Sequence, residues 1–212
     1  MALKKASSGD PADTSIRRIT PQDATQGLAA LCEQLTDADA HMRREAACDL
    51  AAHPQAANRL AAHLDGEADA SVRAVVFSSL ARIGGVAAVD ALLPLLRSED
   101  AMLRNGAIEV MAGLPDAVAP RIEALLVDAD SDVRILSVNL LGQLPHPMVP
   151  QWLAQCLAHE TEPNVVGAVL DVLAEVGGPE LAGPLRQALL RFVDEPYLGF
   201  AASLVLQRIE AP

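Results

Sequence analysis

One segment pattern of about 31 residues recurs along this sequence and constrains the fold more than any other feature. An Asp or Glu lies four residues before a fixed position that is Arg in four of the six copies. Successive acids are 30, 31, 30, 32 and 33 residues apart. The pairs are Asp39/Arg43, Asp69/Arg73, Asp100/Arg104, Asp130/Arg134, Glu162/Val166 and Glu195/Gly199. Such a period indicates a repeat protein, in which each unit packs on its neighbours.

Each acid is expected to begin a helix. Asp69 has the chemistry of an N-cap, because its carboxylate can accept from free N–H groups of the first turn. Val72, Val76 and Leu80 then recur at helical spacing, and Gly84 is expected to end this helix in the left-handed region. The core positions should therefore lie one residue before the fixed position and three, seven and ten residues after it.

A second, less regular helix is predicted to precede each acid. It ends in a Leu eight or nine residues before the fixed position, and no stretch shows the two-residue alternation of a strand. These leucines are Leu35, Leu64, Leu96, Leu126, Leu157 and Leu190. We therefore predict an all-α fold, a right-handed α-α superhelix (solenoid) of about six helix pairs.

The predicted organisation is a flexible N-terminal tail over residues 1–20 and a single solenoid over residues 21–210. The tail carries Lys4, Lys5, Arg17 and Arg18, and either folds back onto the acidic body or serves as an interaction arm. The expected repeats are 21–53, 54–84, 85–114, 115–145, 146–177 and 178–210.

Net charge, hydropathy and cysteine content limit the kinds of partner and the cellular location that can be expected. The formal net charge of −12 would repel nucleic acid and anionic membrane surfaces, so neither is expected as a partner. No apolar run is long enough to cross a membrane. Cys32, Cys48 and Cys156 are widely spaced and odd in number, so buried free thiols in a reducing cytosol are expected. The default location is cytoplasmic.

A helix pair of this length, with Asp-x-x-Val-Arg opening the second helix, resembles the short HEAT repeat of the type found in phycobilisome bilin-lyase subunits. The resemblance covers residues 21–210. It implies that second helices line a concave face and that the Asp and Arg are structural, with each Arg bridging neighbouring units. Val166 and Gly199 depart from the pattern, so packing rather than this Asp/Arg ladder is expected to join the last two repeats.

The face of the second helices opposite the core is the predicted binding surface. Residues one, five and nine positions after the fixed position lie four apart and share one stripe. This surface either binds a protein partner or is merely solvated. The proposed partner-binding residues are Arg44, Ser78, Arg82, Asn105, Glu109, Asn139, Gln143, Asp171 and Glu175.

The C-terminal repeat holds most of the few aromatic residues. Phe192, Tyr197 and Phe200 lie within nine residues, although Phe, Tyr and Trp total only five. They could close the end of the core, or Tyr197, Phe200 and Leu204 could form an apolar docking site for a partner or a second copy. Trp152 is expected in the core.

A non-enzymatic protein-protein interaction scaffold is the main functional hypothesis, with an assembly or maturation accessory factor as its more specific form. The alternatives are a bilin-lyase-like subunit and another HEAT-based enzyme or metal protein. No catalytic residue, metal ligand or cofactor is predicted, because His159-Glu160 is an isolated dipeptide and no cysteine pair is close enough for zinc. The oligomeric state is left open.

Overall fold

The computed structural model describes residues 21–211, with side chains from residue 27 onward, so the predicted tail lies outside the described residues. The described part is helical throughout and has no strand, which confirms the predicted all-helical solenoid. Three short 3-10 segments occur at Pro54–Ala56, Leu93–Arg97 and Pro179–Leu181. The α-helices are α1 (Pro21–Gln34), α2 (Ala40–Leu50), α3 (Ala57–His63), α4 (Ala70–Ile83), α5 (Gly85–Leu92), α6 (Ala101–Ala112), α7 (Pro115–Leu126), α8 (Ser131–Gln143), α9 (Val149–His159), α10 (Pro163–Val176), α11 (Ala182–Leu189) and α12 (Pro196–Ile209).

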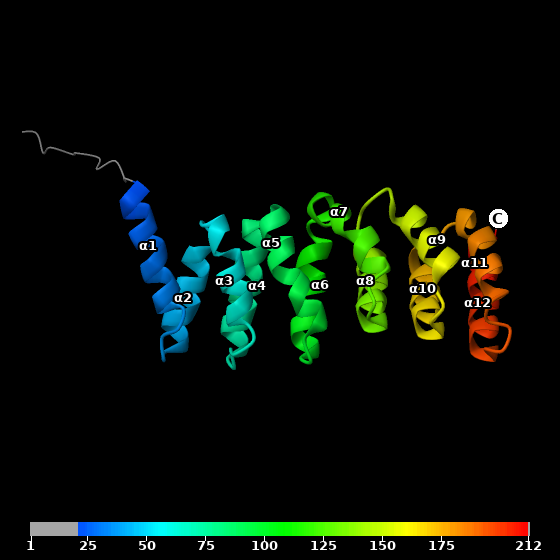
Figure 1. Cartoon of the computed structure of the whole chain (residues 1–212), viewed down its shortest axis with the longest axis horizontal. Helices are drawn as coiled ribbons and strands as arrows, with labels where there is room; N and C mark the ends of the chain where they lie inside the picture. The colour runs from blue at the N-terminus through cyan, green and yellow to red at the C-terminus, as the bar shows by residue number, and fades with distance from the viewer. Residues whose placement is uncertain (1–20, 212) are drawn as a thin grey trace, which may run out of the picture.

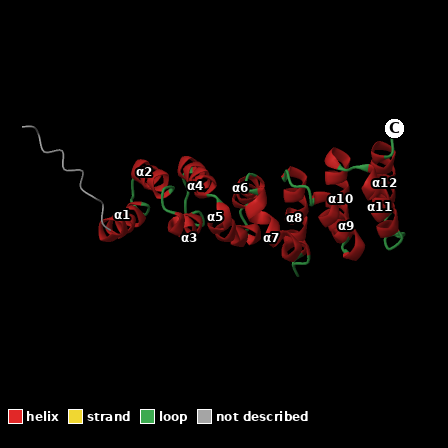
Figure 2. Ribbon diagram, turned by 90° about the horizontal axis from the view of Figure 1, so that it is seen from above, coloured by secondary structure: helices red, strands yellow, loops and turns green. Residues whose placement is uncertain are grey.

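The helices form six successive pairs that stand side by side along the long axis of the molecule (Figure 1). Seen from above, α2, α4 and α6 lie along one side, and α1, α3 and α5 lie along the other (Figure 2). In the even-numbered layer, each helix from α2 to α12 packs on the next. In the odd-numbered layer, contacts run from α3 to α11 in the same way. The even-numbered helices therefore form one continuous layer.

The helix starts follow the predicted capping chemistry in four repeats and depart from it in two. The carboxylates of Asp39, Asp69, Asp100 and Asp130 each accept from the backbone N–H two residues on, at 2.8–2.9 Å. Glu162 and Glu195 occupy N-cap positions without a side-chain cap, and proline follows each of them. Because proline has no N–H, fewer free donors remain there to be capped.

The prediction that a glycine with positive φ ends a helix is confirmed at Gly84. Gly84 ends α4 with φ 63°, in the left-handed region that favours glycine. The similar Gly-Gly pair after α10 behaves differently, because Gly177 is extended, with φ −67° and ψ 142°, and a Cβ there would lie only 2.7 Å from the carbonyl oxygen of Leu173.

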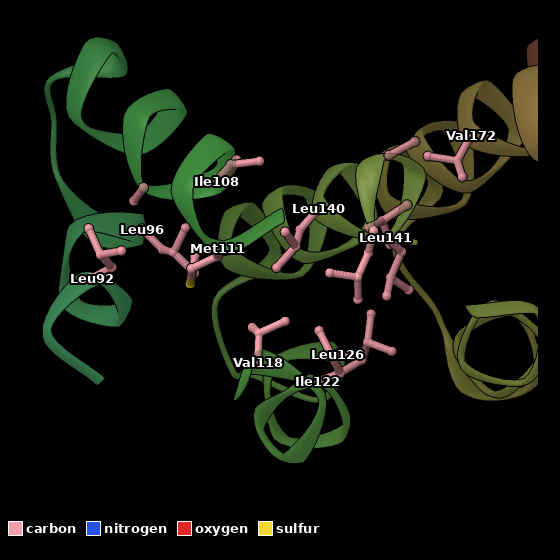
Figure 3. Close-up of a cluster of buried hydrophobic side chains, with 14 of the residues drawn as sticks. Leu92, Leu96, Ile108, Met111, Val118, Ile122, Leu126, Leu140, Leu141 and Val172 are labelled. Carbon is pink, nitrogen blue, oxygen red and sulfur yellow. The ribbon is translucent and has the colours of Figure 1, made fainter. Parts of the chain in front are cut away.

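The core lies between the two layers and follows the predicted register. Val72, Val76 and Leu80 of α4 are fully buried, as the helical spacing predicts. Figure 3 shows how Met111 of α6 and Leu141 of α8 lie in the apolar layer above α7. Each pair therefore shares its apolar interior with its neighbours, which is how repeats too small to fold alone become stable.

Leu190 is 67% exposed, because it follows the last helix of the odd-numbered layer and no further described repeat covers it. Two predictions about burial are wrong. Val176, which lies ten residues after the fixed position and ends α10, is exposed. Among the cysteines only Cys156 is buried, whereas Cys48 is exposed and Cys32 is half-buried. Trp152 is buried as predicted and stacks on His146, with ring centroids 4.8 Å apart.

The repeated arginines join neighbouring repeats at the loop edge, as the resemblance implies. Arg43 donates to the carbonyl oxygens of Asp37 and Ala38 in its own loop, at 2.9 and 3.0 Å. Its other nitrogens bind both carboxylate oxygens of Glu67 in the next repeat, at 2.7 and 2.8 Å. Arg134 makes the same bidentate contact with the carboxylate of Glu160, at 2.9 and 3.0 Å. Such pairing fixes both distance and orientation between units.

The second and third junctions vary this arrangement. Arg73 donates to the carbonyl oxygen of Glu67 at 2.5 Å and to the carboxylate of Asp100 at 2.8 Å. Arg104 binds its own loop, through the carbonyl of Ser98 at 2.6 Å. The bridge to the fourth repeat comes instead from Arg97, which reaches the carboxylate of Asp128 at 2.5 Å.

No arginine at the fixed position joins the last two repeats, and hydrogen bonds from two other arginines act there together with packing. Arg191 donates to the carbonyl of Leu157, and Arg208 donates to the carbonyls of Leu173 and, at 2.7 Å, Gly177. Both arginines belong to the sixth repeat and bind the fifth. They bind backward along the chain, as Arg82 and Arg121 do, whereas Arg43, Arg73 and Arg134 bind forward to the next repeat.

Leu141 tests the register of the solenoid. It is 1% exposed in the fourth repeat, so Leu141→Ala leaves a cavity and should lower the free energy of unfolding by roughly 2–5 kcal/mol. Leu190→Ala is the matched control and should change it by less than about 0.5 kcal/mol. Urea unfolding followed by circular dichroism measures both. A loss below about 1 kcal/mol for Leu141→Ala would contradict the register.

Glu67 tests the arginine bridge through pH. Hydrogen bonding from Arg43, with smaller contributions from the Asp69 N–H and His63, lowers the pKa of Glu67 from 4.5 to about 2. The unfolded chain therefore binds the extra proton between these values, so stability from this carboxylate is complete above pH 4.5 and is lost as pH falls towards 2. Glu67→Gln should lower stability by about 1–3 kcal/mol at neutral pH.

The difference between wild type and Glu67→Gln should shrink as pH falls through that window. Glu99→Gln, at an exposed carboxyl in the loop of the third repeat, is the control and should track the wild type. Thermal melts at about pH 7, 5, 4 and 3 compare the three proteins. A difference that stays constant over this range would rule out ionised Glu67 as the source of the stability.

Candidate functional site

Six of the predicted binding residues line one hollow on the exposed side of the even-numbered layer. The hollow has a volume of about 600 Å³ and spans α6, α8 and α10. Residues four apart on a helix point the same way, so three adjacent helices bring two such residues each. We call this site the acidic hollow. Its lining consists of Asn105, Ile108, Glu109, Asn139, Gly142, Gln143, Asp171, Val172 and Glu175.

The floor of the acidic hollow is apolar. Ile108 and Val172 are buried, and Figure 3 shows them on the helices to either side of α8. Gly142 lies on α8, and a Cβ added there would lie only 3.0 Å from Cγ2 of Val172. The glycine therefore allows close approach of α8 and α10 and keeps the floor low.

The rim of the acidic hollow carries uncompensated negative charge. The side chains of Glu109, Asp171 and Glu175 are exposed, and the lining contains no Lys, Arg or His. Within residues 27–211, none of the three forms an ion pair. The same lining also carries side-chain amides. Each amide offers both hydrogen-bond donors and an acceptor, whereas the carboxylates only accept. These amides belong to Asn105, Asn139 and Gln143.

A second hollow of about 330 Å³ continues this surface towards α12. Asn139 and Asp171 line both hollows. Further along, the lining includes Gly167 of α10, the carboxylate-bearing Glu195 and the ring of Tyr197. The two hollows thus form one groove, which runs across four consecutive even-numbered helices.

The C-terminal aromatic residues divide between the core and the surface. Phe192 is buried, so the interpretation that the cluster closes the core holds for this residue alone. Tyr197, Phe200 and Leu204 of α12 are 67%, 66% and 52% exposed. We call these three residues the apolar patch. They lie three and four residues apart and therefore share one helix face, beside the end of the groove.

The structure does not bring the first two repeats into this site. Arg44 donates to Oγ of Ser71 at 3.2 Å, and Arg82 donates to the carbonyl of Cys48 at 3.4 Å. These contacts join α2 to α4. Ser78 lies on α4 and lines neither hollow. The predicted stripe therefore divides into a basic section over α2 and α4 and an acidic section from α6 onward.

Sequence reasoning missed the floor of the groove. Ile108, Gly142 and Val172 follow the fixed position of their repeats by four, eight and six residues, so they share no register that a repeat comparison could detect. The sequence marks Glu195 only as an acid at a helix start. Its place in the groove depends on how α12 packs beside α10, which the sequence does not encode locally.

Two other hollows lie at the loop edge and are built around the arginine bridges. One, of about 480 Å³, surrounds Arg43 and Glu67, and the other, of about 640 Å³, surrounds Arg134 and Glu160. Burial raises the pKa of the Cys156 thiol beside the second one to about 12. This thiol therefore stays protonated at neutral pH and lacks the thiolate form that acts as a nucleophile.

A metal site requires clustered ligands, and a membrane span requires a long apolar helix. No group of three or more His, Cys, Asp and Glu side chains between residues 27 and 211 is arranged to hold a metal ion. In the part of the chain that the structure covers, no helix combines the length and the apolar character needed to cross a membrane.

Comparison with known proteins adds a family and one curated relative. Residues 14–112 and 118–202 match the sequence pattern of the family described as HEAT repeats. The bilin biosynthesis protein PecE of Mastigocladus laminosus is 32% identical over 159 residues, which cover 70% of this chain and 59% of that protein. The chain thus spans about three fifths of the length of this relative.

Two solved structures match this chain at low sequence identity. The archaeal HEAT-like repeats protein from Thermococcus onnurineus NA1 is 19% identical with a TM-score of 0.41, and the match covers 88% of each chain. The complex of CpcE and CpcF of phycocyanin lyase from Nostoc sp. PCC7120 is 17% identical with a TM-score of 0.32, covering 97% of this chain and 100% of that one.

The acidic hollow should tolerate charge reversal. Because its three carboxylates are exposed and unpaired, the triple variant Glu109→Lys, Asp171→Lys and Glu175→Lys should keep the helical fold and melt within a few degrees of wild type. Three acid-to-lysine changes make the formal net charge of −12 less negative, which relieves self-repulsion. Circular dichroism and thermal melting check this. A loss of helix would show that these carboxylates stabilise the fold.

Proposed function

This chain belongs to the family of HEAT-repeat proteins, and from that premise we propose that it is a non-enzymatic scaffold that binds a protein partner along its groove. The partner would lie across α6, α8, α10 and α12. In this proposal the chain is an accessory factor in the assembly or maturation of that partner. The proposed location is cytoplasmic, and the free state of its three cysteines accords with a reducing compartment.

The observation that carries the proposal is the continuity of the groove. Six polar side chains from three helices line one hollow, and the next hollow shares Asn139 and Asp171 with it. A surface that crosses several equivalent helices suits an elongated partner, because each repeat contributes a similar contact. Extended surfaces of this kind are the binding sites of repeat proteins in general.

The titrating groups support binding rather than catalysis. Active sites tend to hold groups with strongly shifted pKa values in a cleft. Here each carboxyl with a lowered pKa owes the lowering to an arginine or to backbone or side-chain donors around the repeat junctions and helix ends. These carboxyls are Glu67, Asp69, Asp100, Asp128, Glu160 and Glu210. None of them lines the acidic hollow, and the two that line the loop-edge hollows, Glu67 and Glu160, are held by the arginines that join the repeats.

A bilin-lyase-like subunit is the second candidate. The observation that favours it is the 32% identity to a protein named for bilin biosynthesis. In that case the chain would act on a tetrapyrrole together with a partner subunit. The groove would then hold a chromophore in addition to a protein, and the purified complex would absorb visible light.

Affinity capture from the source cell tests the main proposal. The full chain is compared with the charge-reversed triple variant of the acidic hollow and with a control triple variant. The control changes lie on α1 and α7, which belong to the odd-numbered layer away from the groove. The control carries Glu33→Lys, Asp116→Lys and Glu123→Lys. The two triples have equal net charge, so only the place of the change differs. A partner held by wild type and control, and reduced at least about tenfold with the hollow variant, is expected.

Two results would contradict the proposal. Equal recovery of the partner with all three proteins would mean that it binds elsewhere. A visible absorption band in the wild-type eluate that is lost with the hollow variant would favour the bilin-lyase candidate. Mass spectrometry and an absorption spectrum of the same eluates distinguish these results.

A further inference from the structure

We infer that the segment bound in the groove is an extended stretch of a protein partner that carries Lys or Arg side chains at one end and an apolar side chain at the other. The basic side chains lie over Glu109, Asp171 and Glu175, and the apolar one lies on the apolar patch. This inference rests on the proposed function and adds the chemistry of the partner.

The need for basic side chains follows from desolvation. Glu109, Asp171 and Glu175 line the acidic hollow, Glu195 lines its continuation, and no Lys or Arg lines either hollow. A protein that covers the groove removes water from these carboxylates. Burying an unpaired carboxylate is strongly unfavourable, whereas a cation that hydrogen-bonds to it offsets the lost hydration. A partner with neutral or acidic side chains here would therefore bind poorly.

The need for an apolar side chain follows from the apolar patch. Tyr197, Phe200 and Leu204 are each more than half exposed on one face of α12. Elsewhere in the chain aromatic residues are rare, and Phe192 and Trp152 are buried. Exposed aromatic and aliphatic side chains that lie together commonly anchor a partner. The patch lies at one end of the groove, so the apolar anchor and the basic residues of the partner are separated along its length.

The extended conformation follows from the amides and the dimensions of the groove. Asn105, Asn139 and Gln143 present both donor and acceptor atoms, which suit the unpaired N–H and C=O groups of an extended backbone. Neighbouring helices pack roughly 8–10 Å apart, so the three steps from α6 to α12 cover about 24–30 Å. At about 3.3 Å per residue, roughly seven to nine extended residues span this distance.

The same charges disfavour a second copy of the chain as the occupant. A symmetric dimer through this face would place one acidic hollow against an identical one. Like charges brought together in this way repel, and the formal net charge of −12 adds to the repulsion.

The test is a selection from a random peptide library, about 12 residues long to exceed the span of the groove, on the full chain. Enriched peptides are synthesised with a label and titrated by fluorescence anisotropy at low and high salt. The groove variant is Glu109→Gln, Asp171→Asn and Glu175→Gln, which removes charge with little change of shape. The patch variant is Phe200→Ser and Leu204→Ser. The matched control is Glu33→Gln, Asp116→Asn and Glu123→Gln.

The expected result is enrichment of Lys and Arg on one side of an apolar residue. Affinity should fall at least about tenfold with the groove variant, fall with the patch variant, decrease with added salt and remain unchanged with the control. Peptides without basic residues, whose binding is lost with the patch variant alone, would overturn the inference and leave the proposed groove function standing.

Two further outcomes also decide the question. Peptides that bind the wild type, groove and patch variants equally would overturn the inference together with the proposed function. Light scattering of the free proteins tests whether a second copy of the chain occupies this face. A wild-type dimer that becomes a monomer in the patch variant, with no peptide enrichment, would overturn the inference. It would identify this face as a contact between copies.

Discussion

The structure depends on arginine side chains that hold the loop of one repeat and a polar group of the next. In the clearest cases, Arg43 and Arg134 bind two loop carbonyls with one guanidinium nitrogen and a buried carboxylate with the others. Breaking such a pair on one side is costly, because the remaining charge stays buried without a partner. Successive helix pairs are thus fixed at the loop edge, while apolar packing joins them along their length.

Because charged pairs join the repeats at the loop edge, the charged residues of the groove are free to contact a partner. The charged groups of the loop edge pair with one another across repeats, as Arg97 does with Asp128. The carboxylates of the even-numbered helices that line the groove, Glu109 and Asp171 among them, are left to solvent. A solenoid held together at its edge can vary the exposed residues of its faces without loss of stability, and the charge and shape of the groove are the result.

Much of this architecture could be predicted from the sequence because it depends on local rules. Spacing alone predicts the buried Val72, Val76 and Leu80 and the capping role of Asp69. The stripe rule also predicts the six polar residues of the acidic hollow. The buried carboxylates Glu67 and Glu160, which accept from Arg43 and Arg134, escaped prediction, although an acid or Ser recurs six residues before the fixed position in five repeats. Those residues are Asp37, Glu67, Ser98, Asp128 and Glu160.

Other features could not be predicted from the sequence, because they depend on how whole helices pack. The exposure of Leu190 reflects its place at the end of a layer, and the backward reach of Arg191 depends on where α11 lies against α9. The floor of the groove likewise forms only where α8 and α10 approach closely at Gly142.

The central claim is that the groove is the surface on which a protein partner lies. Photo-crosslinking tests it most directly, with benzoylphenylalanine placed at Asn139, which lines both hollows, and at Asp116 on α7 as the control. The account predicts a crosslink from the groove position to a defined protein segment with Lys or Arg near the point of attachment, and none from the control position. A crosslink from the control position with none from the groove position would contradict it.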